Sequence, residues 1–380
     1  MLIGIDGNEA NEVRKDIGAR VGSNVVAYQM LWALYKNKNK WGKKHKIAIY
    51  LKNKPKKDMP PEDVEVFRYV VLGDRAFWVV TKLMPVLYSK NKPDVLHTFS
   101  HYLPIFSPVP MGLTIHDLGF LKYSAQFKKK DYWQLKHWTA KSINISKYII
   151  TVSKYSKRDL IKNYPSAKDK VHVIYNSYDS KLIGKSFSKK EKEKTLKKYK
   201  ISKDYLFFLG TLKPSKNPDG LIQAFSKIKE KSLVLVIAGG KGWMYESINK
   251  LVKNLGIEDK VIFTGFVSEK EKAILLQEAK VLISPSFWEG FGIHVLEAFA
   301  SGTPVIVSDR ASLPEIAGDA AIYVDPDSVK SIKQAIEKLI QMKEVEYNKL
   351  VHEGLNRLKM FDWSNSAEKL IEVLEKNISQ

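Results

Sequence analysis

The sequence predicts an α/β protein of two doubly wound domains, each with a parallel sheet covered by helices. Short β-rich runs alternate with longer polar or helical stretches, which is typical of βαβ units. The alternation runs through the first half, stops in a lysine-rich stretch at 181–200, and then starts again. A length of 380 residues also exceeds what one ordinary core holds. We therefore expect two domains that face each other across a cleft.

The expected strands follow from these apolar runs. In the first domain they lie at 2–6, 46–51, 94–99, 111–117, 147–153 and 170–176. In the second domain they lie at 204–210, 232–239, 260–265, 280–286, 303–309 and 320–325. The end of the chain predicts an amphipathic helix with Ser364 or Asn365 as its N-cap. We place the domains at 1–190 and 191–360, followed by a terminal helix at 361–380.

Composition excludes several kinds of site. The chain has no cysteine, which excludes disulfides, thiolate metal sites and cysteine nucleophiles. The start, MLIGIDGNEA, lacks the basic-then-apolar layout of a signal peptide. No apolar run approaches the roughly 20 residues that span a bilayer. We therefore expect a cytoplasmic protein, either free or peripheral on the inner face of the cell membrane.

Positive charge is concentrated in the first half of the chain. Residues 1–200 hold 40 Lys and Arg against 17 Asp and Glu, whereas residues 201–380 hold 23 against 24. The excess either solubilises the surface or attracts an anionic partner, namely nucleic acid, a phosphate-bearing acceptor or an anionic membrane. Nucleic acid is the weakest of these, because the sequence shows no zinc-finger spacing, RNP-type aromatic motif or heptad-bearing basic helix. The segment 127–138 would suit lipid headgroups, although Trp133 and Trp138 individually fit a buried core.

Two carboxylates in the second domain point to chemistry. Glu289 and Glu297 are separated by seven residues, with Gly290 and Gly292 between them where a loop enters a helix. Open α/β sheets bind ligands beyond the carboxyl ends of their strands. Glycine lets backbone N–H groups approach a ligand closely, and a helix N-terminus favours an anion such as diphosphate. We therefore expect the two carboxylates to flank a bound ligand that carries such an anion.

The segment 284–309, SPSFWEGFGIHVLEAFASGTPVIVSD, resembles the signature of the retaining glycosyltransferases of family 4. The resemblance covers essentially the whole C-terminal half and implies the GT-B fold of two Rossmann-like domains. It implies that Glu289 contacts the donor sugar and that Glu297 binds the nucleotide ribose. It assigns the diphosphate to the turn of Gly290, Phe291 and Gly292. His294 stands where proline is common in the family, and we expect its side chain only to cover the helix start.

The segment 208–217, FLGTLKPSKN, resembles the family stretch in which basic side chains neutralise the donor diphosphate. The resemblance assigns this role to Lys216, close to Gly210. Ser215 stands where the family has arginine, so that one phosphate contact is either lost or supplied by Lys213 or another residue. The base-reading loop of the family is matched by residues 264–267, which include Gly265, Phe266 and Val267.

The N-terminal half resembles the family less strongly. His116 lies at an expected strand end, where the family has a His-Asp pair whose histidine approaches the donor sugar and phosphate. We expect Asp117 to orient the loop. Gly18, Arg20 and Gly22 lie in the loop after the first strand, which in the family touches phosphate and acceptor; Arg20 is either an acceptor contact or solvent-exposed. The resemblance also implies that the terminal helix crosses back to the first domain.

No metal or cofactor is expected. Asp325 and Asp327 form an Asp-x-Asp, but the surrounding VDPDS is an ordinary turn sequence. The resemblance leaves the diphosphate charge to lysine and a helix N-terminus, so that the sugar nucleotide is a substrate and no divalent metal is required.

The resemblance implies a retaining hexosyltransferase that transfers mannose from GDP-mannose to a glycan or lipid-linked acceptor in surface polysaccharide or glycolipid synthesis. The motif forms look like those of mannosyltransferase members, and a UDP-sugar donor is the alternative. The basic N-terminal domain is expected to bind the acceptor and to contact an anionic membrane, and no nucleic acid. Two other classes remain open: a nucleotide-sugar epimerase of the same fold, and a non-catalytic binder of sugar nucleotides or nucleic acid.

Overall fold

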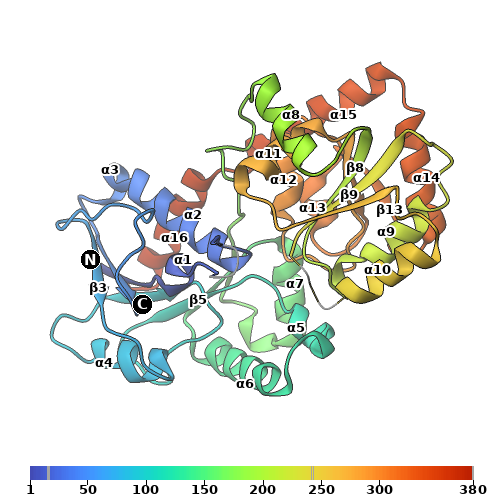
Figure 1. The fold of residues 1–380 in the computed structure, drawn as a ribbon. Coiled ribbons are helices and arrows are strands. Elements are labelled where there is room, and N and C mark those ends of the chain that lie inside the picture. Colours follow the sequence, from blue (N-terminus) through green and yellow to red (C-terminus); the bar gives the residue numbers. More distant parts are fainter. Residues whose placement is uncertain (15–17, 241, 243, 379–380) are drawn as a thin grey trace. The chain divides into compact units, whose positions relative to one another are not determined.

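A computed structural model describes residues 1–14, 18–240, 242 and 244–378 of the chain (Figure 1). The chain forms two units. Unit 1 comprises Met1–Asn176 together with Asp362–Gln380, and unit 2 comprises Ser177–Phe361. The division at 176/177 precedes the expected boundary at 190/191, because the lysine-rich stretch belongs to unit 2. There it forms α8 (Lys189–Lys198), which Ser188 caps.

Unit 1 contains a seven-stranded parallel sheet in the order β3-β2-β1-β4-β5-β6-β7. Its strands are β1 (Leu2–Asp6), β2 (Lys46–Leu51), β3 (Phe67–Val71), β4 (Val95–Thr98), β5 (Met111–Ile115), β6 (Tyr148–Thr151) and β7 (Val171–Val173). Its helices are α1 (Asn8–Asn11), α2 (Ser23–Lys36), α3 (Lys38–Trp41), α4 (Met84–Val86), α5 (Gly119–Lys122), α6 (Lys129–Ile145), α7 (Lys154–Asn163) and α16 (Trp363–Lys376). A single turn of π-helix, Val79–Leu83, precedes α4.

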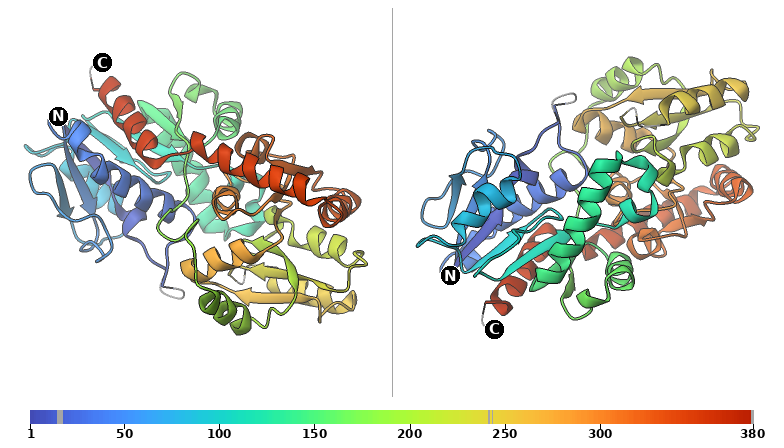
Figure 2. Two further views of the ribbon diagram at one scale, coloured as in Figure 1. Left: turned by 90° about the horizontal axis from the view of Figure 1, so that it is seen from above. Right: turned by 90° about the horizontal axis from the view of Figure 1, so that it is seen from below.

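Both faces of the unit 1 sheet are buried, which explains its nearly continuous apolar strands. Along β2, Ile47 and Ile49 pack into one core with α2 and α16, while Ala48 and Tyr50 pack into a second core on the opposite face. The last helix lies beside α2 although some 330 residues separate them in the sequence (Figure 2). The terminal helix therefore belongs to unit 1.

The start of α16 and the edge of the sheet differ from expectation. The N-cap of α16 is Asp362, whose carboxylate accepts a hydrogen bond from the backbone N–H of Asn365 at 2.9 Å, so that neither Ser364 nor Asn365 is the cap. Strand β3 was not expected. It is an edge strand with exposed residues such as Arg68, and edge strands show a weaker apolar pattern.

Unit 2 contains a six-stranded parallel sheet in the order β10-β9-β8-β11-β12-β13. Its strands are β8 (Asp204–Leu209), β9 (Leu233–Ala238), β10 (Val261–Gly265), β11 (Val281–Ser284), β12 (Val305–Ser308) and β13 (Ala321–Val324). Besides α8, its helices are α9 (Pro218–Phe225), α10 (Tyr245–Asn254), α11 (Glu269–Glu278), α12 (Ile293–Ala300), α13 (Leu313–Ala317), α14 (Val329–Ile340) and α15 (Glu344–Arg357).

The strand order of unit 2 reverses direction between β8 and β11. From β8 the chain winds outward through β9 and β10, and it then returns to place β11 on the other side of β8. Such a reversal point opens a crevice at the carboxyl ends of the two strands, where α/β sheets bind their ligands. The expected donor-binding residues at 210–216 and 290–292 lie in the loops that follow these two strands, whereas those at 265–267 lie at the end of β10 and Glu297 lies in α12. Over the described ranges, no helix is long and apolar enough to cross a membrane.

Candidate active site

The candidate site of unit 2 is built from the loops that follow β8 and β11. The backbone N–H of Trp288, in the loop after β11, donates a hydrogen bond to the carbonyl of Ser215, in the loop after β8, at 3.3 Å. Ser215 is buried. The residue that replaces the family arginine is thus part of the contact between the two loops and brings no positive charge to the site.

Lys216 and Glu289 form an ion pair between these loops. Only 8% of Glu289 is exposed, and its carboxylate also accepts a hydrogen bond from the hydroxyl of Ser286 at 3.0 Å. Burial by itself raises the pKa of the Glu289 carboxyl, but the charge of Lys216, helped by the nearby His294 ring and by hydrogen bonds from Lys216 and Ser286, outweighs it and lowers the pKa. Glu289 is therefore ionised at neutral pH.

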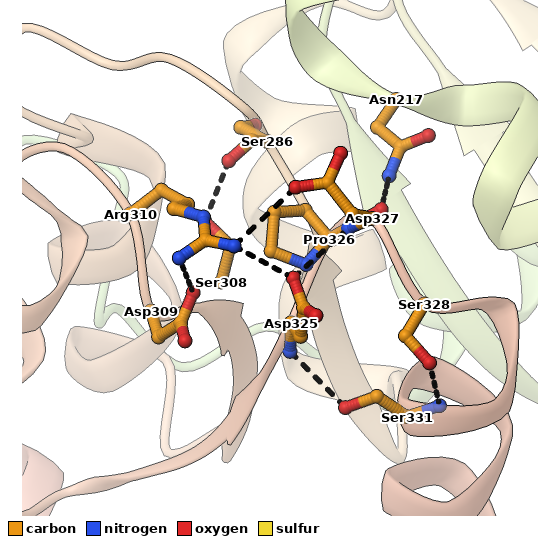
Figure 3. Close-up of polar contacts among 10 residues, drawn as sticks. All are labelled: Asn217, Ser286, Ser308, Asp309, Arg310, Asp325, Pro326, Asp327, Ser328 and Ser331. Atoms are coloured by element: carbon orange, nitrogen blue, oxygen red, sulfur yellow. Dashed lines mark hydrogen bonds and ion pairs between the residues drawn. The ribbon is translucent and has the colours of Figure 1, made fainter.

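Asn217 holds the lysine loop in place. Its backbone is left-handed, with φ at 55°, and its side-chain oxygen caps α9 by accepting a hydrogen bond from the N–H of Gly220 at 3.2 Å. Its amide nitrogen donates to the carbonyl of Pro326 at 2.8 Å, as Figure 3 shows. Asn217, the residue after Lys216, is thus held by two side-chain hydrogen bonds, and it fixes the turn that carries Lys216.

Gly292, the last residue of the turn from Gly290 to Gly292, has a backbone that glycine alone adopts easily. Gly292 has φ at 98° and directly precedes α12, and a Cβ atom there would lie 2.8 Å from a methyl carbon of Leu313. The hydroxyl of Ser312 lies 2.9 Å from the carbonyls of both Glu289 and Phe291. The first N–H groups of α12 have no partner within the helix, which favours an anion at this point.

Glu297 lies within α12, with 7% of its surface exposed. Its carboxylate pairs with Lys272 of α11 at 2.6 Å, and Lys272 also contacts Glu269 at 2.7 Å. Burial disfavours the ammonium charge, but the two carboxylates outweigh it and raise the pKa of Lys272. Both glutamates of the motif therefore have a lysine partner.

His294 does more than cover the helix start. Its Nε2 lies 2.8 Å from the hydroxyl of Ser284, and that hydroxyl lies 3.2 Å from the hydroxyl of Ser286. His294 is thereby connected to Glu289 through two serines. Burial, opposed by Glu289 and assisted by the two nearby lysines, lowers the pKa of His294 to about 4. The imidazole is neutral at pH 7.

The other expected donor-binding residues lie at the same edge of the sheet. Gly210 follows β8, and its N–H donates to the carbonyl of Ala238 at 2.9 Å. Gly265 ends β10 with φ at 69°. Phe266 is partly exposed, whereas Val267 is buried. Lys213 is partly buried and precedes the turn that carries Lys216.

In unit 1, His116 follows β5. Its Nε2 lies 3.3 Å from the carbonyl of Phe99, and its own carbonyl accepts a hydrogen bond from Ser156 at 3.1 Å. Burial lowers the pKa of His116, while Asp117 and the Phe99 carbonyl oppose this shift. Asp117 orients the loop, since its carboxylate accepts the N–H of Gly119 at 2.7 Å.

The loop after β1 contains two left-handed glycines, Gly18 and Gly22, with φ at 61° and 56°. Arg20, between them, is not solvent-exposed, since 9% of its side chain is accessible. Its guanidinium pairs with Asp58, donates to the carbonyl of Ala10 at 2.6 Å and lies over the ring of Tyr28. Arg20 therefore holds this loop against unit 1. Residues 15–17 of the loop lie outside the described residues.

Asp325 and Asp327 form ion pairs with the side chain of Arg310. The guanidinium of Arg310 lies 2.9 Å from the carboxylate of Asp325 and 3.3 Å from that of Asp327 (Figure 3). In the part of the chain that the structure describes, no group of three or more His, Asp or Glu side chains could hold a metal ion.

Both halves of the chain match family models of glycosyltransferases. Residues 188–355 match the family model of glycosyl transferases group 1, and residues 22–182 match that of glycosyltransferase family 4. The chain is 30% identical to O-antigen chain mannosyltransferase B of Escherichia coli over 68% of each chain. It is 32% identical to O-antigen chain mannosyltransferase RfbU of Salmonella typhimurium over 70% of each chain. This chain belongs to glycosyltransferase family 4.

Solved structures confirm the GT-B fold of this glycosyltransferase. Sucrose-phosphate synthase of Thermosynechococcus elongatus superimposes with a TM-score of 0.75 at 19% identity, covering 99% of this chain and 98% of that chain. WaaG, a glycosyltransferase involved in lipopolysaccharide biosynthesis, gives a TM-score of 0.70 at 14% identity, covering 98% and 99%.

Sequence reasoning missed several residues around the site of the glycosyltransferase. Lys272, Ser284 and Ser286 contact the motif side chains directly, and Ser312 fixes the turn. In unit 1, His101 interacts electrostatically with His116, and burial lowers the pKa of His101 to about 4. The sequence could have pointed to Ser284, Ser286 and Ser312 as candidate site residues, because they lie in or near the recognised motifs. Lys272 gave none, because it stands in a charged helix 25 residues before its partner.

Proposed function

We propose that this glycosyltransferase is a retaining hexosyltransferase that transfers mannose from GDP-mannose to a hydroxyl group of a glycan or lipid-linked acceptor. The observation that carries the proposal is the buried Lys216–Glu289 pair beside the left-handed Gly292 turn, at the point where the strand order reverses. Mannose is favoured because the two relatives described above are named as mannosyltransferases of O-antigen chains. Their names also support a surface polysaccharide as the product.

The proposed reaction forms a bond between the acceptor oxygen and the anomeric carbon of the sugar, on the face from which the nucleoside diphosphate departs. The bond between the anomeric carbon and the phosphate oxygen breaks, and the proton of the acceptor hydroxyl passes to the leaving phosphate. Negative charge grows on the diphosphate as this bond breaks. Lys216 and the N–H groups of the turn stabilise that charge, so that catalysis is mainly electrostatic.

Lys216 can serve both carboxylate and diphosphate. A lysine ammonium has three N–H donors, of which one meets Glu289. The remaining donors are available to a phosphate oxygen beside the carboxylate. Lys213, three residues earlier in the same loop, is the candidate for the contact that Ser215 does not provide. With these cations, the proposed mechanism requires no divalent metal.

We assign acceptor and membrane binding to unit 1, on the cytoplasmic face of the membrane. A cavity of about 360 Å³ in unit 1 is lined by Phe77, Val80, Thr81, Ile105, Trp138 and Lys141. Phe77 and the neighbouring Phe106 are each 68% exposed, and Lys141 lies over the ring of Phe106. Trp133 is 51% exposed rather than buried. Aromatic rings beside lysines suit the boundary between headgroups and acyl chains.

A panel of sugar nucleotides tests the donor. A specific ligand at 100 times its dissociation constant adds about 2.7 kcal/mol of stability, which a thermal-shift assay detects easily. GDP-mannose is expected to give the largest increase in melting temperature. A larger increase with UDP-glucose would indicate that the donor is a UDP-sugar instead. Incubation with donor and acceptor should yield a product with retained anomeric configuration. A new sugar nucleotide formed without acceptor would instead indicate an epimerase, and binding without any product a non-catalytic binder.

Flotation with vesicles tests the membrane assignment. The wild type should float with vesicles that contain anionic lipid, and the double variant Phe77→Ser/Phe106→Ser should lose most of that binding. Val345→Ser is the matched control, since Val345 is an apolar residue of unit 2 that is 80% exposed. Binding that is indifferent to lipid charge, salt and the phenylalanines would remove the assignment.

A further inference from the structure

The side chains around Glu289 form one continuous chain of polar contacts. From the loop after β11 into α12, the order is Glu289, Ser286, Ser284 and His294, with distances of 3.0, 3.2 and 2.8 Å. Both serines are buried. The family resemblance gives no reason for a histidine at the end of this chain, since proline is common there.

The ionised carboxylate at one end fixes the direction of every hydrogen bond. Glu289 can only accept, so Ser286 uses its single hydroxyl proton to donate to it. Ser284 must then donate its own proton to the oxygen of Ser286. Ser284 has no second proton, so the contact with His294 requires that Nε2 of the imidazole carries a proton and donates it.

This direction sets the tautomer of His294. The lowered pKa keeps the ring neutral, and a neutral imidazole carries one proton. Because that proton is on Nε2, Nδ1 presents a lone pair and can only accept. Among the described residues, Nδ1 of His294 has no hydrogen-bond partner. Unlike Nδ1 of His97, which is fully buried, Nδ1 of His294 is accessible to solvent.

The ring also lies beside the proposed donor site. Cε1, the carbon between the two ring nitrogens, lies 3.9 Å from the place where a Cβ atom of Gly292 would be. A hydrogen-bond acceptor at this point cannot bind the oxygens of a diphosphate, which are acceptors themselves. It needs a donor, and sugars supply hydroxyl groups.

We propose that Nδ1 of His294 accepts a hydrogen bond from a hydroxyl group of the transferred sugar, which makes His294 a specificity residue for the donor. This inference rests on the proposed use of a sugar nucleotide. Loss of one such hydrogen bond is expected to lower kcat/KM about 10-fold.

Two variants separate the two ring nitrogens. His294→Gln places an amide nitrogen near the position of Nε2, which keeps the donor to Ser284 and removes the acceptor at Nδ1. His294→Asn places a carbonyl oxygen near the position of Nδ1, which keeps the acceptor and removes the contact with Ser284. Each variant is the control for the other, and thermal unfolding verifies that both fold.

The experiment measures kcat/KM for GDP-mannose and its 2-, 3-, 4- and 6-deoxy analogues, and binding of GDP alone. For one deoxy analogue, kcat/KM of the wild type and of His294→Asn should be about 10-fold lower than for GDP-mannose. For His294→Gln, kcat/KM should be the same for that analogue and for GDP-mannose. GDP binding should not differ among the three proteins.

An unchanged deoxy profile in His294→Gln would overturn the inference, and so would an equal loss of affinity for GDP and GDP-mannose. If another sugar nucleotide is the best donor in the panel, its own deoxy analogues replace those of GDP-mannose. Absence of turnover with every sugar nucleotide would refute the proposed function, and the inference with it. Turnover with an unchanged profile would refute the inference alone.

Discussion

Replacement of Lys216 by methionine is expected to destabilise unit 2, because it leaves a buried carboxylate without its cation. The side chains of Lys216 and Glu289 are 18% and 9% exposed, so water compensates little of the lost charge. Breaking a buried ion pair by removal of one partner costs about 3–5 kcal/mol. The hydroxyl of Ser286 remains on the carboxylate, so we expect about 3 kcal/mol at pH 7.

The loss should shrink at lower pH. In the wild type, the pKa of Glu289 lies below its usual value, so its ionised form adds stability above about pH 4.5 that is lost as the pH falls through the folded pKa. Without Lys216 the effect of burial prevails and raises that pKa. The variant then recovers stability relative to the wild type as the pH falls from 7 to 5 and the carboxyl is protonated.

Urea unfolding measures this effect, with a separate transition fitted for each unit because two-domain chains depart from two-state behaviour. The matched control is Lys192→Met, which breaks the more exposed Lys192–Glu278 pair of unit 2 and should cost at most about 1 kcal/mol. The double variant Lys216→Met/Glu289→Gln should cost at least about 2 kcal/mol less than the sum of the single variants. Equal losses in Lys216→Met and Lys192→Met, or additive single effects, would refute the reasoning.

Gly292→Ala should weaken GDP binding at least about 10-fold by calorimetry, because φ is 98° and the new Cβ meets Leu313; Gly256→Ala, which has positive φ but open space, should bind GDP normally. Lys272→Met should lower the free energy of unfolding in urea by about 3 kcal/mol, because it leaves the buried Glu297 carboxylate without its cation. A loss below about 1 kcal/mol would contradict this prediction. Burial lowers the pKa of His97 to about 3, so the fold should lose about 2 kcal/mol from this group as the pH falls from 6.5 to 5. His97→Phe should reduce the pH dependence by that amount, and an unchanged dependence would contradict the assignment.

The fold was largely predictable because buried parallel strands carry their own signal. A strand covered on both faces is apolar at almost every position, as β9 is from Leu233 to Ala238, and twelve such runs were recognised. The edge strand β3 was missed because only Phe67 of its five residues is buried, while Arg68 and Val71 are exposed. The cap of α16 was also missed, since Asp362, Ser364 and Asn365 are all residues that cap helices well, and the backbone decides between them.

The partners of the site residues were not predictable. Glu289, Glu297 and Lys216 could be named from motif spacing, but Lys272 reaches Glu297 only because α11 packs beside α12. Arg20 shows the opposite case. A cation in a glycine-rich loop fits a ligand contact, yet Asp58, 38 residues later, pairs with its charge. Sequence order does not encode such contacts; the packing of the elements creates them.

A crystal structure of the protein with GDP-mannose bound tests the central claim most directly. We predict that the diphosphate contacts the N–H groups of the turn that ends at Gly292 and the ammonium of Lys216, and that the mannose lies beside Glu289. A nucleotide bound elsewhere, or one that leaves the Lys216–Glu289 pair untouched and far away, would contradict the account.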